Sequence, residues 1–294
     1  MNFTPCTGKN KVPSRILIIV FLMASITSAH AIIIRHDTGY TRYVARESMF
    51  PSVFWLEQRS MRKVCVATLI DAQWALTAAH CVEETDLRAH IARAGEYAVQ
   101  IAGLLSGIDK VVMHPNYAFR YDQGHADEEV DLALLHLSKP LSMPVPMPLY
   151  REQDELDRVA TLLGWGYFGV GTTGIQSDDG RFRMAQNRVS EAQGRLRFNF
   201  DDPRLPQSHA VDLEGIPGLG DSGGPALLQT ADGWQIAGVA IGEIAAESAP
   251  VGVQGLYGAV GVYERVSGHL GWIESVINAA AIEPVQFDSA HSED

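Results

Sequence analysis

Three residues of this chain have the types needed for acyl transfer. Ser222 lies in GLGDSGGPALL, residues 218–228, His80 lies in WALTAAHC, residues 74–81, and Asp131 opens the apolar run DLALLHL. A serine hydroxyl is a poor nucleophile until a base takes its proton, and histidine suits that role because its pKa lies near neutrality. A carboxylate then fixes the tautomer of the imidazole and stabilises the imidazolium.

Each of these residues also has an ordinary structural interpretation. Glycine, aspartate, serine and proline are the usual residues of surface turns. One histidine among ten is most often structural, and an aspartate at the end of a strand is often solvated. The combination favours chemistry, because a serine nucleophile, a histidine base and a carboxylate that orients the base complement one another.

Six short motifs around these residues resemble those of the trypsin/chymotrypsin-like serine protease family, and they occur in the family's order over roughly residues 32–280. GDSGGP together with TAAHC is a highly specific combination. The motifs are LTAAHC (76–81), HPNY (114–117), DLALL (131–135), GWG (164–166), GDSGGP (220–225) and GVYERV (261–266).

The resemblance implies a fold and a mechanism. The expected fold is all-β, with two six-stranded antiparallel β-barrels and the active site in the cleft between them. His80 and Asp131 would come from the first barrel and Ser222 from the second. The backbone N–H groups of Gly220 and Ser222 would form an oxyanion hole, with Gly220 letting the backbone approach the substrate closely. Such a serine endopeptidase acts on protein or peptide substrates and needs no metal or organic cofactor.

The start of the chain predicts export. Lys9, Lys11 and Arg15 precede the apolar run 16–26, and a small-residue cleavage pattern ends at Ala31. These features indicate a signal peptide at residues 1–31. A membrane anchor is the alternative, but a span needs about 20 apolar residues. We therefore expect a secreted protein, extracellular or periplasmic, that has no membrane attachment after cleavage.

Cysteine usage agrees with export. Cys6 would be lost with the signal peptide, which leaves Cys65 and Cys81. An even pair in an exported protein suggests one disulfide bond, and the spacing does not suit zinc. The family resemblance pairs the same two residues, as a staple for the loop that carries His80.

Cleavage after Ala31 would make Ile32 the first residue. The resemblance implies that the free amine of an apolar first residue enters the protein and pairs with the acid before the serine, which is Asp221 here. We hypothesise that signal peptidase itself creates this activating terminus. The alternative is that Ile32 is an ordinary strand residue after a flexible end.

The residues expected at the specificity pocket are Ile216, Glu243 and Gly261. Trypsin-like members carry an aspartate six residues before the serine, but this chain has Ile216. Simple preference for arginine or lysine is therefore not supported at that position. Glu243 would favour basic side chains, narrow the pocket or simply be a solvated acid, which is the commoner fate of glutamate.

Composition and two further motifs exclude other classes. The 294 residues carry a net charge of −12, which argues against a nucleic-acid-binding protein. GVGTTG, residues 169–174, fits a dinucleotide motif, but the required helix does not follow. ADEEVD, residues 126–131, lacks the ligand spacing of a calcium loop.

The expected organisation is one protease domain, residues 32–282. Barrel one would cover about 32–145 and barrel two about 146–268, joined near the proline-rich stretch 142–150. A helix at 269–281 has apolar residues on one face, and 283–294 forms a disordered acidic tail. We expect a monomer. The alternative functions are a non-catalytic binding module on the same fold and hydrolysis of small esters.

Overall fold

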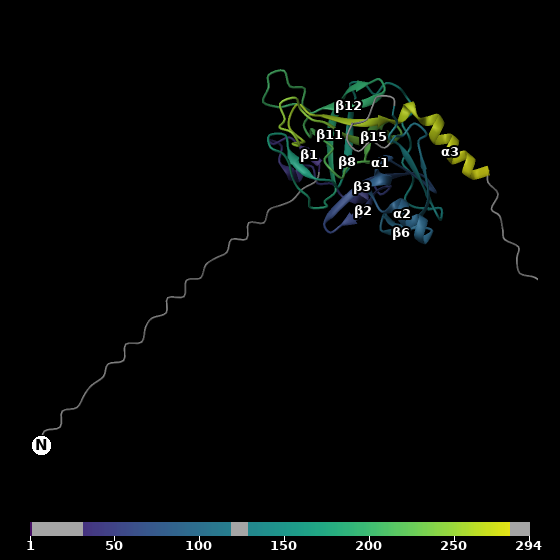
Figure 1. The fold of residues 1–294 in the computed structure, drawn as a ribbon. Helices are drawn as coiled ribbons and strands as arrows, with labels where there is room; N and C mark the ends of the chain where they lie inside the picture. Colours follow the sequence, from purple (N-terminus) through teal and green to yellow (C-terminus); the bar gives the residue numbers. More distant parts are fainter. Residues whose placement is uncertain (2–31, 119–128, 283–294) are drawn as a thin grey trace, which may run out of the picture.

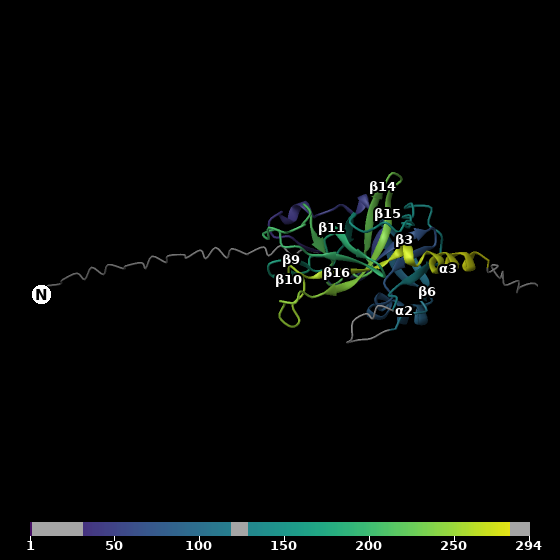
Figure 2. The same ribbon diagram turned by 90° about the horizontal axis from the view of Figure 1, so that it is seen from above.

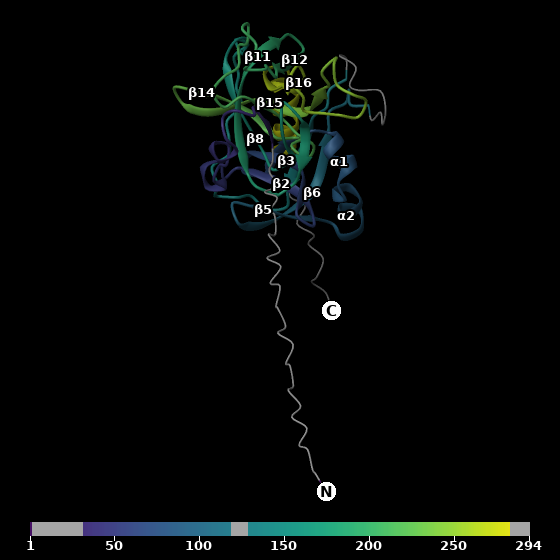
Figure 3. The same cartoon turned by 90° about the vertical axis from the view of Figure 1, so that its left-hand side faces the viewer.

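The structure is a computed structural model that describes residues 32–118 and 129–282. The predicted signal peptide with Cys6, and the predicted acidic tail at 283–294, lie outside the described residues. The remaining chain forms two β-sheet halves, which Figures 1 and 3 show one above the other.

The first half is a six-stranded antiparallel sheet. Its order is β2-β3-β4-β7-β6-β5, and the edge strands β2 and β5 approach each other, so the sheet curls into a barrel. The strands are β2 (Val53–Arg59), β3 (Arg62–Asp71), β4 (Trp74–Thr77), β5 (Tyr97–Ile101), β6 (Leu104–Met113) and β7 (Ala133–Leu137).

The second half is a closed six-stranded barrel of order β11-β12-β16-β15-β14-β8. Its strands are β8 (Val159–Gly164), β11 (Arg183–Ala192), β12 (Arg195–Asn199), β14 (Pro225–Thr230), β15 (Gly233–Ile244) and β16 (Val260–Arg265). Neighbouring strands pair antiparallel in both halves. The predicted fold of two six-stranded antiparallel barrels is confirmed.

A smaller four-stranded sheet was not expected. Its order is β10-β9-β1-β13, with strands β1 (Ile32–Ile34), β9 (Phe168–Val170), β10 (Gly174–Ser177) and β13 (Gly215–Ile216). β1 runs parallel to β9 and antiparallel to β13, so it lies with the second half although its residues open the range expected for barrel one. All three isoleucines of β1 are buried, which this central position explains. Figure 2 shows β9 and β10 at one end of the molecule.

Three α-helices occur in the described residues: α1 (His80–Glu84), α2 (Leu87–Ala94) and α3 (Leu270–Ile282). α3 lies close to the helix expected at 269–281, whereas α2, in which only Leu87 is buried, was not expected. Three 3₁₀ turns complete the structure: η1 (Tyr40–Arg42), η2 (Glu47–Met49) and η3 (Val266–Gly268).

The C-terminal helix packs against the first half. Ile273 is fully buried in the core cluster that includes most first-half strands. The Trp272 ring lies 4.8 Å from that of His114, which follows β6. α3 therefore returns from the end of the second barrel to the first (Figure 1). No helix of the described residues is long and apolar enough to cross a membrane.

Candidate active site

The His80–Asp131 pair forms where two neighbouring strands meet. His80 begins α1 soon after β4, and Asp131 comes just before β7. β4 and β7 pair antiparallel with Thr77 opposite Ala133, so the two residues reach the same edge of the sheet. The Nδ1 atom of His80 lies 2.5 Å from Asp131 Oδ2, and the backbone N–H of His80 donates to Oδ1 at 2.8 Å.

This arrangement sets the chemistry of the imidazole. Asp131 is fully buried, so its carboxylate needs such donors. Because Nδ1 donates to Asp131, Nε2 is the nitrogen that accepts a proton in the neutral ring. Burial lowers the pKa of His80, but the hydrogen bond and the charge of Asp131 outweigh burial, and the pKa is raised. The pair can therefore act as a base that holds its proton firmly once charged.

The loop that carries Ser222 is wedged between β3 and β15. On one side, the N–H groups of Cys65 and Val66 donate to the carbonyls of Gly220 and Ser222, at 3.1 and 2.8 Å. On the other side, the N–H of Gly223 donates to Ala240 O at 2.7 Å. With both carbonyls turned toward β3, the N–H groups of Gly220 and Ser222 donate to no protein acceptor in the part of the chain that the structure describes.

Two glycines of this loop are required by space and backbone conformation. Gly220 has φ +95°, and a Cβ there would lie 2.7 Å from Lys63 O. Gly223 has φ +79°, and a Cβ there would lie 2.1 Å from Val66 O and 2.3 Å from the Thr77 hydroxyl. A Cβ on Gly220 would therefore clash with β3. The sequence had suggested another reason for this glycine, which is the close approach of its backbone to the substrate.

A cleft of about 790 Å³ joins these groups at the boundary of the two halves. Its walls include His80, Gly220, Ser222 and Glu243. The two unbonded N–H groups and the serine thus face the same space as the histidine. This combination suits a serine nucleophile with a base and a binding site for a developing oxyanion.

The disulfide bond expected from the sequence is present. It joins Cys65 in β3 to Cys81 in α1, with the Cα atoms 5.8 Å apart. It therefore ties the strand that holds the Ser222 loop to the helix that begins with His80. Both sulfur atoms are consumed by the bond, so the nearby His80 does not form a thiolate metal site with them.

The three residues expected at a specificity pocket lie together. Glu243 stands opposite Gly261 in the β15–β16 pair. A Cβ on Gly261 would lie 2.9 Å from Pro217 Cδ and 3.4 Å from Ile216 Cγ2, so the fully buried Ile216 lies next to Gly261. Of the three, only Glu243 is among the residues lining the cleft.

Glu243 is largely withdrawn from solvent. Its Oε1 accepts the N–H of Gly255 at 2.8 Å, and no cation pairs with it among the described residues. Burial raises the pKa of Glu243 to about 7. Of the alternatives left open by the sequence, the solvated acid does not agree with this placement.

Ile32 and Asp221 both contact the short segment 166–168. The backbone of Ile32 pairs with Phe168, while Asp221 accepts the N–H groups of Gly166 and Gly218, at 2.6 and 2.8 Å. Burial raises the pKa of Asp221 to about 7. No hydrogen bond joins Ile32 and Asp221 within the described ranges. Ile32 also has φ +59°, an unusual value for a β-branched residue.

One group near Asp131 was missed by the sequence analysis. Glu264 is 1 % exposed, and its Oε1 accepts the N–H of Asp131 at 3.0 Å and Nε of Arg195 at 3.1 Å. Arg195 also donates to the carbonyl of Glu129 at 2.6 Å. This network fixes the backbone that presents Asp131. The sequence feature that could have pointed to Glu264 is an acid followed by an arginine within the motif GVYERV. The sequence alone does not show which residue such an acid would pair with.

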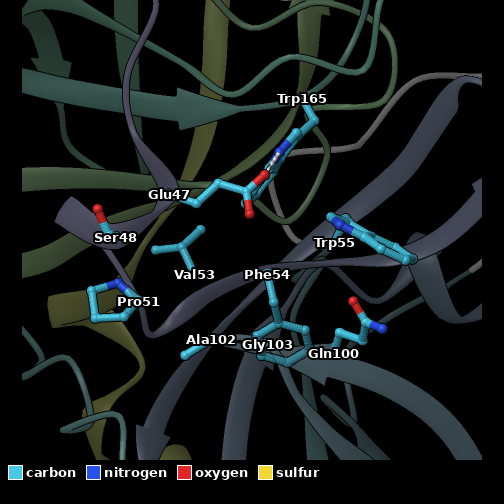
Figure 4. Close-up of a pocket in the computed structure, with 10 residues that line it drawn as sticks. All are labelled: Glu47, Ser48, Pro51, Val53, Phe54, Trp55, Gln100, Ala102, Gly103 and Trp165. Carbon is cyan, nitrogen blue, oxygen red and sulfur yellow. Dashed lines mark hydrogen bonds between the residues drawn. The ribbon is translucent and has the colours of Figure 1, made fainter.

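A second cavity of about 360 Å³ shares no lining residue with the cleft (Figure 4). It lies beside Trp55 and Trp165, and Trp165 Nε1 donates to Glu47 Oε1 at 3.0 Å. Its lining includes neither histidine nor cysteine. The Glu47 carboxylate accepts a hydrogen bond from the indole of the GWG motif, and the lining of this cavity offers no histidine to act as a base.

Comparison with known proteins agrees with the geometry. The family model named Trypsin matches residues 42–273. Vitamin K-dependent protein C of Oryctolagus cuniculus is 28% identical over 253 residues, which cover 75% of this chain and 48% of that protein. Phenoloxidase-activating factor 3 of Holotrichia diomphalia is 26% identical over 234 residues, covering 71% of this chain and 63% of that protein. The chain thus spans about half to somewhat under two thirds of these relatives.

The close packing of the Ser222 loop between β3 and β15 predicts that two glycine substitutions differ in their effect on stability. Gly223→Ala is expected to lower the free energy of unfolding by about 3 kcal/mol or more, because it adds a backbone clash to an unfavourable φ. Gly233→Ala is the matched control, since Gly233 has φ +106° with no atom within 4 Å of the added Cβ. It should cost only about 1 kcal/mol. Urea unfolding of both variants measures the difference, and equal losses would contradict the clash.

Proposed function

Because the chain belongs to the trypsin family, we propose that it is a secreted serine endopeptidase in which Ser222, His80 and Asp131 act as a catalytic triad. One observation carries the proposal: His80, which is hydrogen-bonded to the buried Asp131, lines the same cleft as Ser222. The predicted signal peptide and the disulfide bond support secretion, since such bonds persist in oxidising compartments.

The proposed reaction proceeds through an acyl-enzyme. Ser222 Oγ attacks the scissile carbonyl carbon and passes its proton to Nε2 of His80, while the N–H groups of Gly220 and Ser222 bind the oxyanion. One such donor contributes roughly 3 kcal/mol in the transition state. The imidazolium, stabilised by Asp131, then protonates the leaving amine as the C–N bond breaks. Water, deprotonated by His80, hydrolyses the ester in the same way.

A non-catalytic binding module on this fold is the alternative. Relatives of that kind commonly lose a member of the triad, and this chain retains all three residue types. Hydrolysis of small esters would use the same three residues. Cleavage of peptide substrates would distinguish the proposed endopeptidase from such an esterase.

Covalent labelling tests the triad. A fluorophosphonate probe should label the mature protein, and Ser222→Ala should abolish the signal. The labelling rate should fall as the pH drops through the raised pKa of His80, because a protonated imidazole cannot accept the serine proton. Asp131→Asn should slow labelling by about 10⁴-fold. Correctly processed wild type that is not labelled at any pH would overturn the enzyme proposal.

We also propose that Glu243 lets the pocket accept a basic side chain before the cleaved bond. A buried carboxylate without a counter-ion is costly, and a substrate cation would supply one. Glu243→Gln keeps the acceptor for the N–H of Gly255 but removes the charge. The ratio of kcat/KM for matched lysine and norleucine peptides should fall about tenfold in this variant, and the wild-type ratio should rise with pH through about 7. An unchanged ratio would exclude the role.

The activating terminus is a further part of the proposal. Cleavage after Ala31 would remove the strained φ of Ile32 and create a free amine on that residue. Ile32 pairs with Phe168, which lies two residues after Gly166, and the N–H of Gly166 donates to Asp221. N-terminal sequencing of the active protein should give Ile32 first. A chain made to begin at Ala31 should label slowly, whereas one beginning at Ile32 should label at the mature rate. An active protein that begins well after Ile34 contradicts the hypothesis.

A further inference from the structure

Arg62 stands at the edge of the cleft beside the Ser222 loop. It is the first residue of β3 and lines the cleft together with Leu219 and Gly220. Its guanidinium carbon lies 5.2 Å from the centre of the Tyr167 ring. The N–H of Tyr167 in turn donates to Leu219 O at 2.6 Å. Tyr167, whose ring contacts Arg62, is therefore joined by a backbone hydrogen bond to the loop that carries Ser222.

Among the residues that the structure describes, the Arg62 guanidinium forms no ion pair, unlike the other arginines of the cleft. Arg59 pairs with Glu57 at 2.5 Å, Arg195 with Glu264 at 3.1 Å, and Arg197 lies 3.6 Å from Glu191. The side chain of Arg62 has no ion pair or hydrogen bond to any described residue, although its backbone pairs with Arg59 in the β2–β3 hairpin.

The surroundings of Arg62 explain why a carboxylate would bind there. Its Nε atom is buried and has no hydrogen-bond acceptor. Asp178 is an acid whose charge acts on Arg62 from a distance, and its own buried Oδ2 is likewise unbonded. Because Arg62 lines the cleft and has no carboxylate within ion-pair distance among the described residues, its guanidinium can pair with a carboxylate of the substrate.

Arg62 and the Glu243 pocket lie on opposite sides of Ser222. The serine loop is bonded to β3 on one side and to Ala240 in β15 on the other. Arg62 belongs to β3, whereas Glu243 belongs to β15. A substrate whose side chain before the cut lies near Glu243 must therefore continue toward β3 after the cut.

We propose that Arg62 binds a substrate carboxylate on the leaving-group side of the cleaved bond, and so selects substrates with an acidic residue shortly after the cut. This specificity rests on the proposed peptidase function. A guanidinium offers a planar pair of N–H donors that matches a carboxylate, and its stacking on Tyr167 holds that plane. Because the protein carries net negative charge overall, acidic substrates depend on such a local cation.

A cleavage profile followed by matched peptides tests the assignment. Digestion of a peptide library by wild type should enrich aspartate and glutamate among the first three positions after the cut. The best sequence is then made with glutamate or glutamine at the enriched position. Wild type should show a kcat/KM ratio of about tenfold for glutamate over glutamine, and raised salt should reduce it.

Variants separate the role of Arg62 from general charge. Arg62→Gln should bring the ratio to about one, Arg62→Glu should invert it, and Arg62→Lys should retain only part of it. Arg93→Gln removes one exposed positive charge on α2, away from the cleft, and should keep the wild-type ratio. Fluorophosphonate labelling of each variant shows whether it has folded.

Two outcomes distinguish failure of this proposal from failure of the peptidase function. Efficient cleavage with a ratio near one in wild type, or an unchanged ratio in Arg62→Gln, overturns the role of Arg62 alone. No cleavage of any peptide and no labelling overturn both. Peptides that end two residues after the cut, as free acid or amide, identify the source of the carboxylate. If only the free-acid peptides are preferred, the group that binds Arg62 is the C-terminal carboxylate of the substrate and not an acidic side chain. That result would contradict the proposal as stated.

Discussion

The backbone hydrogen bonds from β3 to the carbonyls of Gly220 and Ser222 are the constraint on which the rest of the candidate site depends. They turn both carbonyls away from the cleft, and this leaves the two N–H groups facing it. The same contacts bring the loop so close to β3 that Gly220 and Gly223 cannot carry a Cβ. Since the loop belongs to the second half and β3 to the first, the site exists only when the halves are docked.

Buried acids around this loop are stabilised in different ways, and the difference separates their roles. Asp131 has the imidazole and the backbone of His80, and Glu264 has Arg195. Asp221 has only backbone N–H groups, and Glu243 has one such group. Burial therefore raises the pKa of Asp221 and Glu243 to about 7. These two carboxylates are the ones for which an additional cation would bring the largest gain.

Much of the fold was predictable because its signals are local. The helix expected at residues 269–281 corresponds closely to α3, because apolar residues at helical spacing are visible in the sequence itself. Family motifs were enough to predict the two barrels. They could not predict the place of β1, because pairing with β9 and β13 depends on residues far along the chain.

The candidate site divides in the same way. His80, Asp131 and Ser222 lie in recognisable motifs, so their residue types and order were visible. The environment of Glu243 was not, because one hydrogen bond from Gly255 and its burial distinguish it from a solvated acid. Arg62 and Glu264 carry no motif signal of their own. Their significance comes from which partners they have or lack, and only the folded chain defines that.

The central place of β1 has a consequence for synthesis of the protein. Ile32 pairs with Phe168, and Ile33 pairs with Ile216, so the first described strand must wait for partners made much later. During synthesis, the three strongly apolar residues of β1 remain unpaired until residues 168 and 216 have been made. Contacts of such long sequence separation are slow to form. A chain truncated before residue 215 would lack β13, one partner strand of β1, so this sheet can be completed only after residues 215–216 have been made.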